Sequence, residues 1–193
     1  MFGLGTIINC SAIIIAGIAG MVFGNHLKDS MQDTLMKADG VAVIFIGIAG
    51  ALSKMLVIKG GTIDTTGTMM MIISLSLGAI VGEMLDLDGK MIHFGEWLKI
   101  KTGNAKDKKF VDGFVTASLT VCIGAMAVVG SIEDGIHADH SILFAKAILD
   151  FVIILVMSAT LGKGCLFSFV PVGLFQGTIT LLSSMISPYI TAS

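Results

Sequence analysis

Six long apolar segments constrain the fold of this chain more than any other feature. A membrane-spanning helix needs about 20 mainly apolar residues, and runs close to that length lie at 4–24, 38–57, 66–84, 111–130, 142–161 and 165–186. The chain is 54% hydrophobic and only 13% charged, about half the charged fraction of an average soluble domain. We therefore expect an all-α, polytopic bundle of about six transmembrane helices whose apolar surfaces face lipid.

The lysines predict how this bundle is oriented. All twelve basic residues are lysines, and lysine-rich loops stay on the cytoplasmic side of a membrane. The side opposite the N-terminus holds Lys28, Lys37, Lys90, Lys99, Lys101, Lys106, Lys108, Lys109 and Lys163. The N-terminal side holds Lys54 and Lys59, and Lys146 lies just inside the fifth segment. We expect an N-terminus outside the cell and a cytoplasmic loop from Lys90 to Lys109.

A three-helix repeat is a second expectation. Gly5-Thr6-Ile7-Ile8 opens the first segment and Gly113-Phe114-Val115-Thr116 opens the fourth, although so few identities could arise by chance. A unit with an odd number of spans inverts when it is repeated, which is typical of secondary transporters with a binding site near the midplane. The predicted division is a first unit at 1–87, a connector at 88–110 and a second unit at 111–193.

The connector contains an amphipathic segment at 88–104. Apolar residues, including Trp97, alternate there with lysines and Glu96. Two interpretations stay open. The segment is either a helix in the membrane interface with Trp97 at the level of the headgroups, or a connector that packs its apolar stripe against the bundle.

Asp150 is the outstanding candidate for chemistry because it lies near the centre of the fifth segment. A charge in the bilayer core costs about 2.5–3.5 kcal/mol on insertion scales, and such residues usually line a pathway. Lys146 precedes Asp150 by four residues, so the two share a helix face and can pair. The functional hypothesis is a proton or cation site at Asp150 tuned by Lys146; the alternative is an ion pair that only fixes packing.

Polar residues in three other segments are candidates for substrate contact. Gln176 follows Pro171, and glycines at 173 and 177 permit a break in the sixth helix. A broken helix beside an amide is how many transporters hold substrate, although Gln176 could equally bond to a neighbouring helix. Asn9 in the first segment and Thr116 and Ser118 in the fourth complete the set. For the two hydroxyls, bonding to a carbonyl one turn back within their own helix is the alternative.

Glu83, at the end of the third segment, is either a cytoplasmic gate or a solvated helix end.

The loop at 133–140 gathers acidic residues with His137 and His140, which suit several divalent metals. No ligand set with specific spacing appears, so we expect a polar solvated loop and assign no metal site. Small residues at Ala12, Ala16, Gly20 and Gly24, and pairs at Gly78/Gly82 and Gly173/Gly177, indicate close helix packing.

Several function classes lack support in the sequence. Cys10, Cys122 and Cys165 stand singly in apolar runs and fit no metal or redox spacing. The opening Gly3-Leu4-Gly5 is no dinucleotide fingerprint, and no nucleophile–base motif appears, so we expect neither an enzyme nor a cofactor. Few and scattered basic residues on a chain of net charge −2 give no sign of nucleic-acid binding.

The residues also resemble a known family. Five stretches are similar to signatures of the YdfK/YqgA-like bacterial membrane proteins and follow one another along the chain in the same order as in that family. They are Gly5-Thr6-Ile7-Ile8-Asn9, the run 110–118, the stretch 130–135, Lys146-Ala147-Ile148-Leu149-Asp150 and Phe175-Gln176-Gly177. The resemblance covers nearly the whole chain and implies a protein of the bacterial cytoplasmic (inner) membrane, a probable transporter without an assigned substrate. Members usually continue into a seventh helix, whereas this sequence ends at Ser193.

These observations favour a small secondary carrier of an ion or solute, coupled to a proton or another cation. Asp150 and Lys146 would form the ion site, and Gln176 and Asn9 would contact substrate. A chain this short has little room for a sealed pathway, so we expect a homo-oligomer in the lipid bilayer. The alternatives are a non-transporting scaffold or stress accessory protein and a passive channel.

Overall fold

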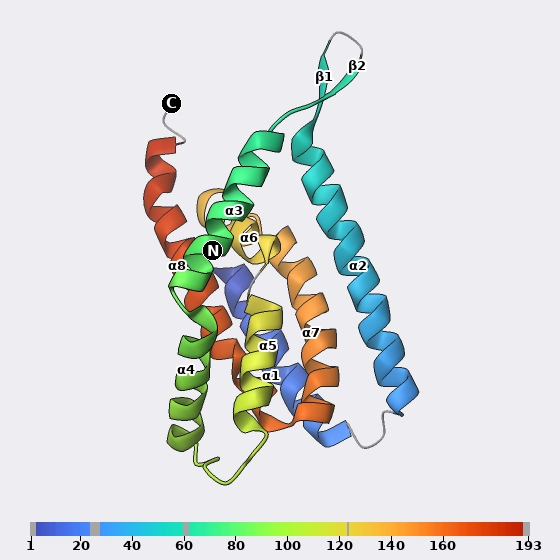
Figure 1. Cartoon of the computed structure of the whole chain (residues 1–193), viewed down its shortest axis with the longest axis vertical. Helices are drawn as coiled ribbons and strands as arrows, with labels where there is room; N and C mark the ends of the chain where they lie inside the picture. Colours follow the sequence, from blue (N-terminus) through green and yellow to red (C-terminus); the bar gives the residue numbers. More distant parts are fainter. Residues whose placement is uncertain (1–2, 24–27, 60–61, 123, 191–193) are drawn as a thin grey trace.

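Six helical segments pack together as the main body of the molecule. The computed structural model describes residues 3–23, 28–59, 62–122 and 124–190. In this body α1 (Leu4–Phe23) lies along α7 (Ser141–Leu161), α6 (Ala125–His137) packs on α8 (Phe169–Ile190), and α5 (Phe110–Cys122) packs on the 3-10 helix η2 (Lys163–Ser168) (Figure 1). The predicted all-α bundle is confirmed.

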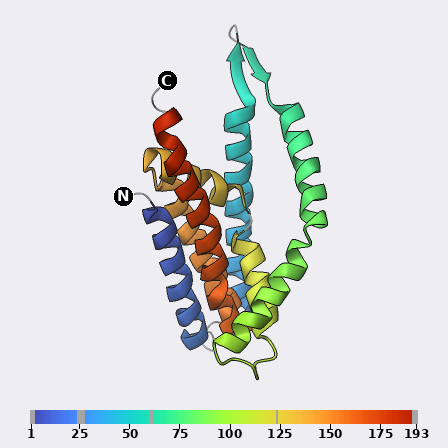
Figure 2. The ribbon, with the colours of Figure 1, turned by 90° about the vertical axis from the view of Figure 1, so that its left-hand side faces the viewer.

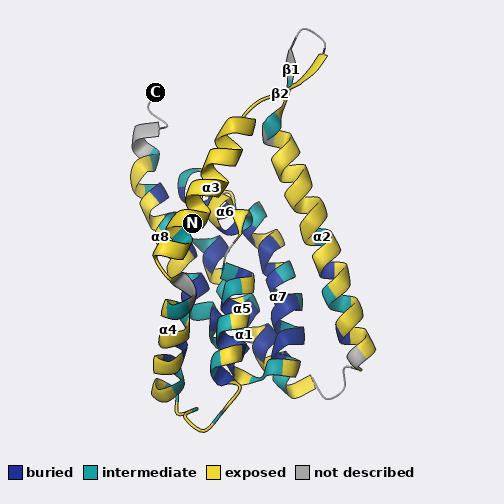
Figure 3. Cartoon of the chain, viewed as in Figure 1, coloured by how far each residue is buried: buried dark blue, intermediate teal, exposed yellow. Residues whose placement is uncertain are grey.

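The segment from α2 to α3 extends away from this body, and α4 returns to it (Figure 2). This segment comprises α2 (Asp29–Met55), the antiparallel strands β1 (Leu56–Lys59) and β2 (Thr62–Thr65), and α3 (Thr68–Met84). The helix α4 (Leu87–Lys101) follows it. α3 buries no residue, and most of α2 is exposed (Figure 3). Because these exposed faces are rich in Ile, Leu, Met, Phe and Val, lipid rather than water is the solvent that they fit.

The described residues include four helical stretches long and apolar enough to cross a membrane: α1, Ser30–Ser53 of α2, α7, and Lys163–Ser187 of η2 and α8. The count rises to six if the bent pairs α3/α4 and α5/α6 each form one span. These two pairs bend by 51° and 59°. The apolar segment 111–130 covers most of the bent pair α5/α6, whereas 66–84 corresponds to α3 alone, since α4 lies in the predicted connector.

The helix breaks differ from those that the sequence indicates. The expected continuous helix over 111–130 is divided into α5 and α6, with Gly124 in an extended conformation at the start of α6. The expected break near Pro171 is absent, since α8 is described as one helix. Pro171 lies in the first turn of α8, where a missing backbone N–H costs little because it has no partner within the helix.

The connector helix α4 packs its apolar stripe against α5. The Asp86 side chain accepts the backbone N–H of Gly89 at the start of α4, and buried Leu98 lies in a small core with Phe110 and Phe114. This packing supports the second interpretation of the amphipathic segment, while Trp97 stays 53% exposed.

Close approach of α1 and α7 depends on small residues. Ala16 is fully buried, and a Cβ atom on Gly20 would lie only 2.3 Å from the backbone oxygen of Leu155. The packing role predicted for these two residues is therefore confirmed. Gly78 and Gly82 on α3 meet nothing within 4 Å in the described chain, and Gly24 lies outside the described residues.

A Gly20→Ala substitution should therefore force α1 away from α7, at a cost of about 1–3 kcal/mol for overpacking. The matched control is Gly47→Ala on α2, where an added Cβ meets nothing within 4 Å. Thermal unfolding of the detergent-purified protein should show a lower midpoint for Gly20→Ala only. Equal midpoints for the two variants would contradict this packing.

Candidate functional site

Four of the predicted site residues meet where α1, α7 and α8 come together. The Lys146 ammonium on α7 lies 2.8 and 2.7 Å from the two Asp150 carboxylate oxygens, one turn further along the same helix. The Asn9 amide on α1 donates to Asp150 at 3.0 Å and to the Gln176 oxygen on α8 at 3.4 Å. Lys146 is 6% exposed, Asp150 2%, and both amide residues 0%. The pairing expected from the sequence is confirmed.

The break between α5 and α6 gives Lys146 its third partner. Its ammonium donates to the backbone oxygen of Val121 at 2.6 Å, and Val121 is the penultimate residue of α5. The last carbonyls of a helix lack N–H partners within the helix and carry the negative end of its dipole. An ammonium has three donor hydrogens, and three acceptor atoms surround this one.

The two amides at this site have unused hydrogen-bonding capacity. The Asp150 carboxylate fixes the orientation of Asn9, because only the amide nitrogen can donate to it. Asn9 Oδ1 and Gln176 Nε2 are then buried without a partner in the described part of the chain. An unpaired buried polar group costs about 1–3 kcal/mol, so an acceptor and a donor are available here to a polar ligand or water.

The other predicted residues do not all join this cluster. Ser118 is fully buried on α5, one turn before Val121, and its hydroxyl finds no partner among the described residues. Thr116 is exposed, and its carbonyl accepts the Thr120 hydroxyl one turn on, which is the intrahelical bonding weighed for these residues. Glu83 is exposed near the end of α3, on a helix with no buried residue.

A buried ion pair is weak evidence for stability. Removing two charges from water costs several kcal/mol per ion, and apolar residues of similar volume often stabilise a protein as well or better. Asp150 is the tenth of the 21 residues of α7, so the pair lies near the middle of a membrane-length helix. Stability alone therefore does not explain why this ion pair lies in the middle of the helix.

Asp134 binds backbone N–H groups at the start of α1, a role that the sequence does not predict. Its fully buried carboxylate accepts the backbone N–H groups of Gly3 and Gly5, both at 3.1 Å, and lies 2.9 Å from His140 Nδ1. It therefore caps the first turn of α1 from α6. Because α1 has no acidic residue in its own first turn and the cap comes from about 130 residues away, spacing gives no signal of it.

The expectation of a solvated loop at 133–140 is wrong for residues 133–137, which form the end of α6 with Asp134 and Gly135 buried, whereas Asp139 is exposed. Glu133 and His137 form an exposed pair one turn apart. Asp139 accepts the hydroxyl and the N–H of Ser141, and these hydrogen bonds hold its pKa below the ordinary value. The described residues include no group of three or more His, Cys, Asp or Glu side chains that could hold a metal ion.

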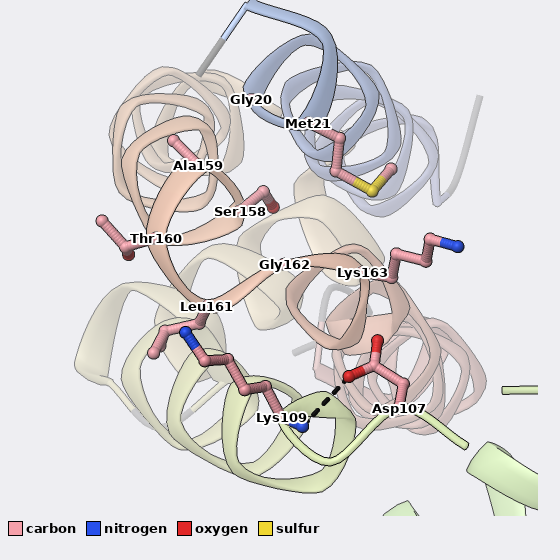
Figure 4. Close-up of a pocket in the computed structure, with 10 residues that line it drawn as sticks. All are labelled: Gly20, Met21, Asp107, Lys109, Ser158, Ala159, Thr160, Leu161, Gly162 and Lys163. Carbon is pink, nitrogen blue, oxygen red and sulfur yellow. Dashed lines mark hydrogen bonds between the residues drawn. The ribbon is translucent and has the colours of Figure 1, made fainter. Parts of the chain in front are cut away.

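Two clefts on the surface of the molecule do not open onto the polar cluster. The larger, of about 370 Å³, lies where α7 meets η2 and is lined by residues that include Gly20, Asp107, Lys109 and Lys163 (Figure 4). The smaller, of about 270 Å³, lies beside the first turns of α2. Neither is lined by Asn9, Lys146, Asp150 or Gln176. The cluster is enclosed in this conformation because all four side chains are buried.

Lys146→Met should be strongly destabilising, by about 3–5 kcal/mol, because it leaves the Asp150 carboxylate buried without its cation. Adding Asp150→Leu should restore most of the loss, since no charge then stays buried at this place. Lys37→Met is the control, as Lys37 pairs with Asp33 on an exposed helix face, where such pairs contribute about 0–1 kcal/mol. Denaturation curves showing equal effects for the two lysines would contradict the burial argument.

Asp134→Ala should loosen the first turn of α1, because two backbone N–H groups lose their acceptor at a cost of about 1–2 kcal/mol. Hydrogen exchange followed by mass spectrometry should show faster exchange confined to the start of α1. Glu133→Ala, next in sequence but more exposed, should leave that exchange unchanged. Unchanged exchange in Asp134→Ala would show that the cap contributes nothing.

Comparison with known proteins agrees with the resemblance found in the sequence. A family described as "Protein of unknown function (DUF554)" matches residues 4–193. "Uncharacterized membrane protein YdfK" of Bacillus subtilis (strain 168) is 30% identical over 182 residues, which cover 94% of this chain and 73% of the relative. "Uncharacterized protein YqgA" of Escherichia coli (strain K12) is 25% identical over 194 residues, which cover 98% and 78%. No solved structure matches significantly. The chain belongs to the DUF554 family.

Proposed function

We propose that this membrane protein is a secondary carrier that moves a small ion or solute, coupled to a proton or another cation. The observation that carries the proposal is the polar cluster of Asn9, Lys146, Asp150 and Gln176, buried near the middle of a membrane-length helix. Charged residues in that position are rare and usually mark an ion or substrate pathway.

The residues of the cluster divide into two roles. Asp150 binds the coupling cation, and Lys146 tunes it through the two contacts to its carboxylate. Gln176 and Asn9 offer a free donor and a free acceptor to the solute, and the Ser118 hydroxyl is a further candidate on α5. Thr116 and Glu83 are left outside the site because both are exposed.

Enclosure of the cluster favours a carrier over a passive channel. A channel needs a continuous path past its selective residues, whereas the four residues of this cluster are buried. A carrier passes through closed states in which its site is sealed from both sides, and movement of α1 or α8 relative to α7 would open it.

The orientation of the carrier in the membrane and its assembly are also part of the proposal. Lys109, which lies with Lys106 and Lys108 in the turn between α4 and α5, lines the same cleft as Lys163 at the start of η2 (Figure 4). We place this end of the bundle in the cytoplasm of a bacterium and the N-terminus outside, in line with the retention of lysine-rich loops. A homo-oligomer and an inverted three-helix repeat remain parts of the hypothesis. The packing of α1 on α7 and α8 joins the two proposed units.

A non-transporting scaffold is the second candidate. It is favoured by the same enclosure, because Lys146 ties α5 to α7, and Asn9 ties α1 to α7 and α8. In that function the polar cluster would only fix the arrangement of the helices. The two candidates differ in one respect, since a scaffold binds and moves no solute.

The test is solute-driven proton movement in proteoliposomes with a pH-sensitive dye inside. Candidate solutes come from a thermal-shift screen of ions, amino acids, organic acids and metals, since a ligand at a hundredfold excess over its Kd stabilises the folded state by about 2.7 kcal/mol. Asp150→Asn should abolish the dye response, while Asp33→Asn, on an exposed face of α2, should retain it. A response that survives Asp150→Asn would remove Asp150 from the site, and a stable wild type that binds nothing would favour the scaffold.

A further inference from the structure

The one buried face of α2 is polar, which is unusual for a membrane-spanning helix. Among its described side chains only Gln32 and Asp39 are buried, each 8% exposed. The two residues are seven positions apart and therefore lie on the same side of the helix. α2 packs on the body of the molecule through α7, the helix that carries Lys146 and Asp150.

Asp39 lies at nearly the same depth as Asp150. It is ten residues after Asp29, the first residue of α2, and Asp150 is eleven residues before Leu161, the last of α7. The start of α2 and the end of α7 lie at the same end of the bundle (Figure 1). At a rise of 1.5 Å per residue, both acids are about 15–17 Å from that end. Because α2 packs on α7, the two carboxylates lie at the same level of two helices in contact.

The charges at this level of α2 and α7 do not balance. α2 carries Asp39, and α7 carries Asp150 and Lys146, so two carboxylates accompany one ammonium at this level of the two contacting helices. The other described charges on the first half of α2, Asp33 and Lys37, pair with each other on an exposed face. One negative charge is left over, and an unpaired ion in a membrane interior costs several kcal/mol.

The hydrogen bonds show which acid must be neutral. Asp150 receives two contacts from Lys146 and one from Asn9, and donors of this kind favour the ionised form of a carboxyl group. In the described part of the chain Asp39 has no hydrogen-bond or ion-pair partner. The excess charge is therefore removed at least cost by a proton on Asp39.

We propose that Asp39 is a proton-binding residue that holds one exchangeable proton against α7 and releases it to water when α2 separates from the body. As a second cation site beside Asp150 it rests on the proposed carrier function and names the proton as its ion; the protonation itself does not depend on transport. Release turns the carboxylic acid into a carboxylate and delivers the proton to water, with no oxidation or reduction. It leaves the face of α2 and α7 with one negative charge, which is tolerated only where water reaches it.

The test is infrared spectroscopy of the complete chain in detergent, following the C=O stretching band of protonated carboxyl groups from neutral to alkaline pH. The chain has 14 Asp and Glu residues, and exposed ones are ionised at neutral pH. Wild type should show a band at neutral pH that disappears at alkaline pH. Asp39→Asn should lack the band, and Asp33→Asn on the same helix should retain it.

A third variant separates a proton site from a structural aspartate. In Asp150→Asn the Lys146 charge has only Asp39 to neutralise it, so Asp39 should ionise and the neutral-pH band should be lost. Absence of the band from wild type, its persistence in Asp39→Asn, or its persistence in Asp150→Asn would each overturn the proposal. A titrating band with no solute flux would reject the carrier alone, and solute flux with no titrating band would reject the Asp39 proton alone.

Discussion

The contact between the Lys146 ammonium and the Asp150 carboxylate determines the positions of several helices in this structure. Two charges enclosed in a membrane interior have to be paired and fully hydrogen-bonded, and the surrounding helices meet that demand. Asn9 brings α1 to the carboxylate, and the backbone oxygen of Val121 brings the end of α5 to the ammonium. The break after α5 is what makes that oxygen available, so the bend between α5 and α6 belongs to the site.

The body and the extended segment satisfy different physical requirements. In the body, small residues such as Ala16 and Gly20 let α1 approach α7 closely, which brings Asn9 within reach of Asp150. In the segment formed by α2, β1, β2 and α3, apolar side chains face outward, and lipid is the solvent that suits them. α2 meets the body through a polar face that includes Asp39. A contact made with a titratable group is one that a change of protonation can weaken.

The sequence predicts this architecture in part, and its failures have physical reasons. Long apolar runs indicate the helices well, because membrane length is a strong constraint. Spacing of four residues predicts the pairing of Lys146 with Asp150, since both lie on one helix. The meeting of Asn9 with Gln176, by contrast, depends on tertiary packing. The break near Pro171 is mispredicted, because a proline in the first turn of a helix is well tolerated, whereas the actual break lies at Gly124. The cap formed by Asp134 depends on packing between distant parts of the chain. Asp39 stands at the start of the apolar segment 38–57, whereas α2 begins at Asp29 and places it inside the helix.

The central claim is that the cluster around Asp150 opens to water on each side of the membrane in turn. The most direct test is Gln176→Cys in a chain whose three native cysteines have been replaced by alanine, labelled from each side of sealed vesicles with a membrane-impermeant thiol reagent. Gln176 is fully buried in this conformation, so a rigid cluster should react from neither side. The account predicts slow labelling from both sides, changed in opposite directions by a pH gradient. Complete protection from both sides under every gradient would contradict it.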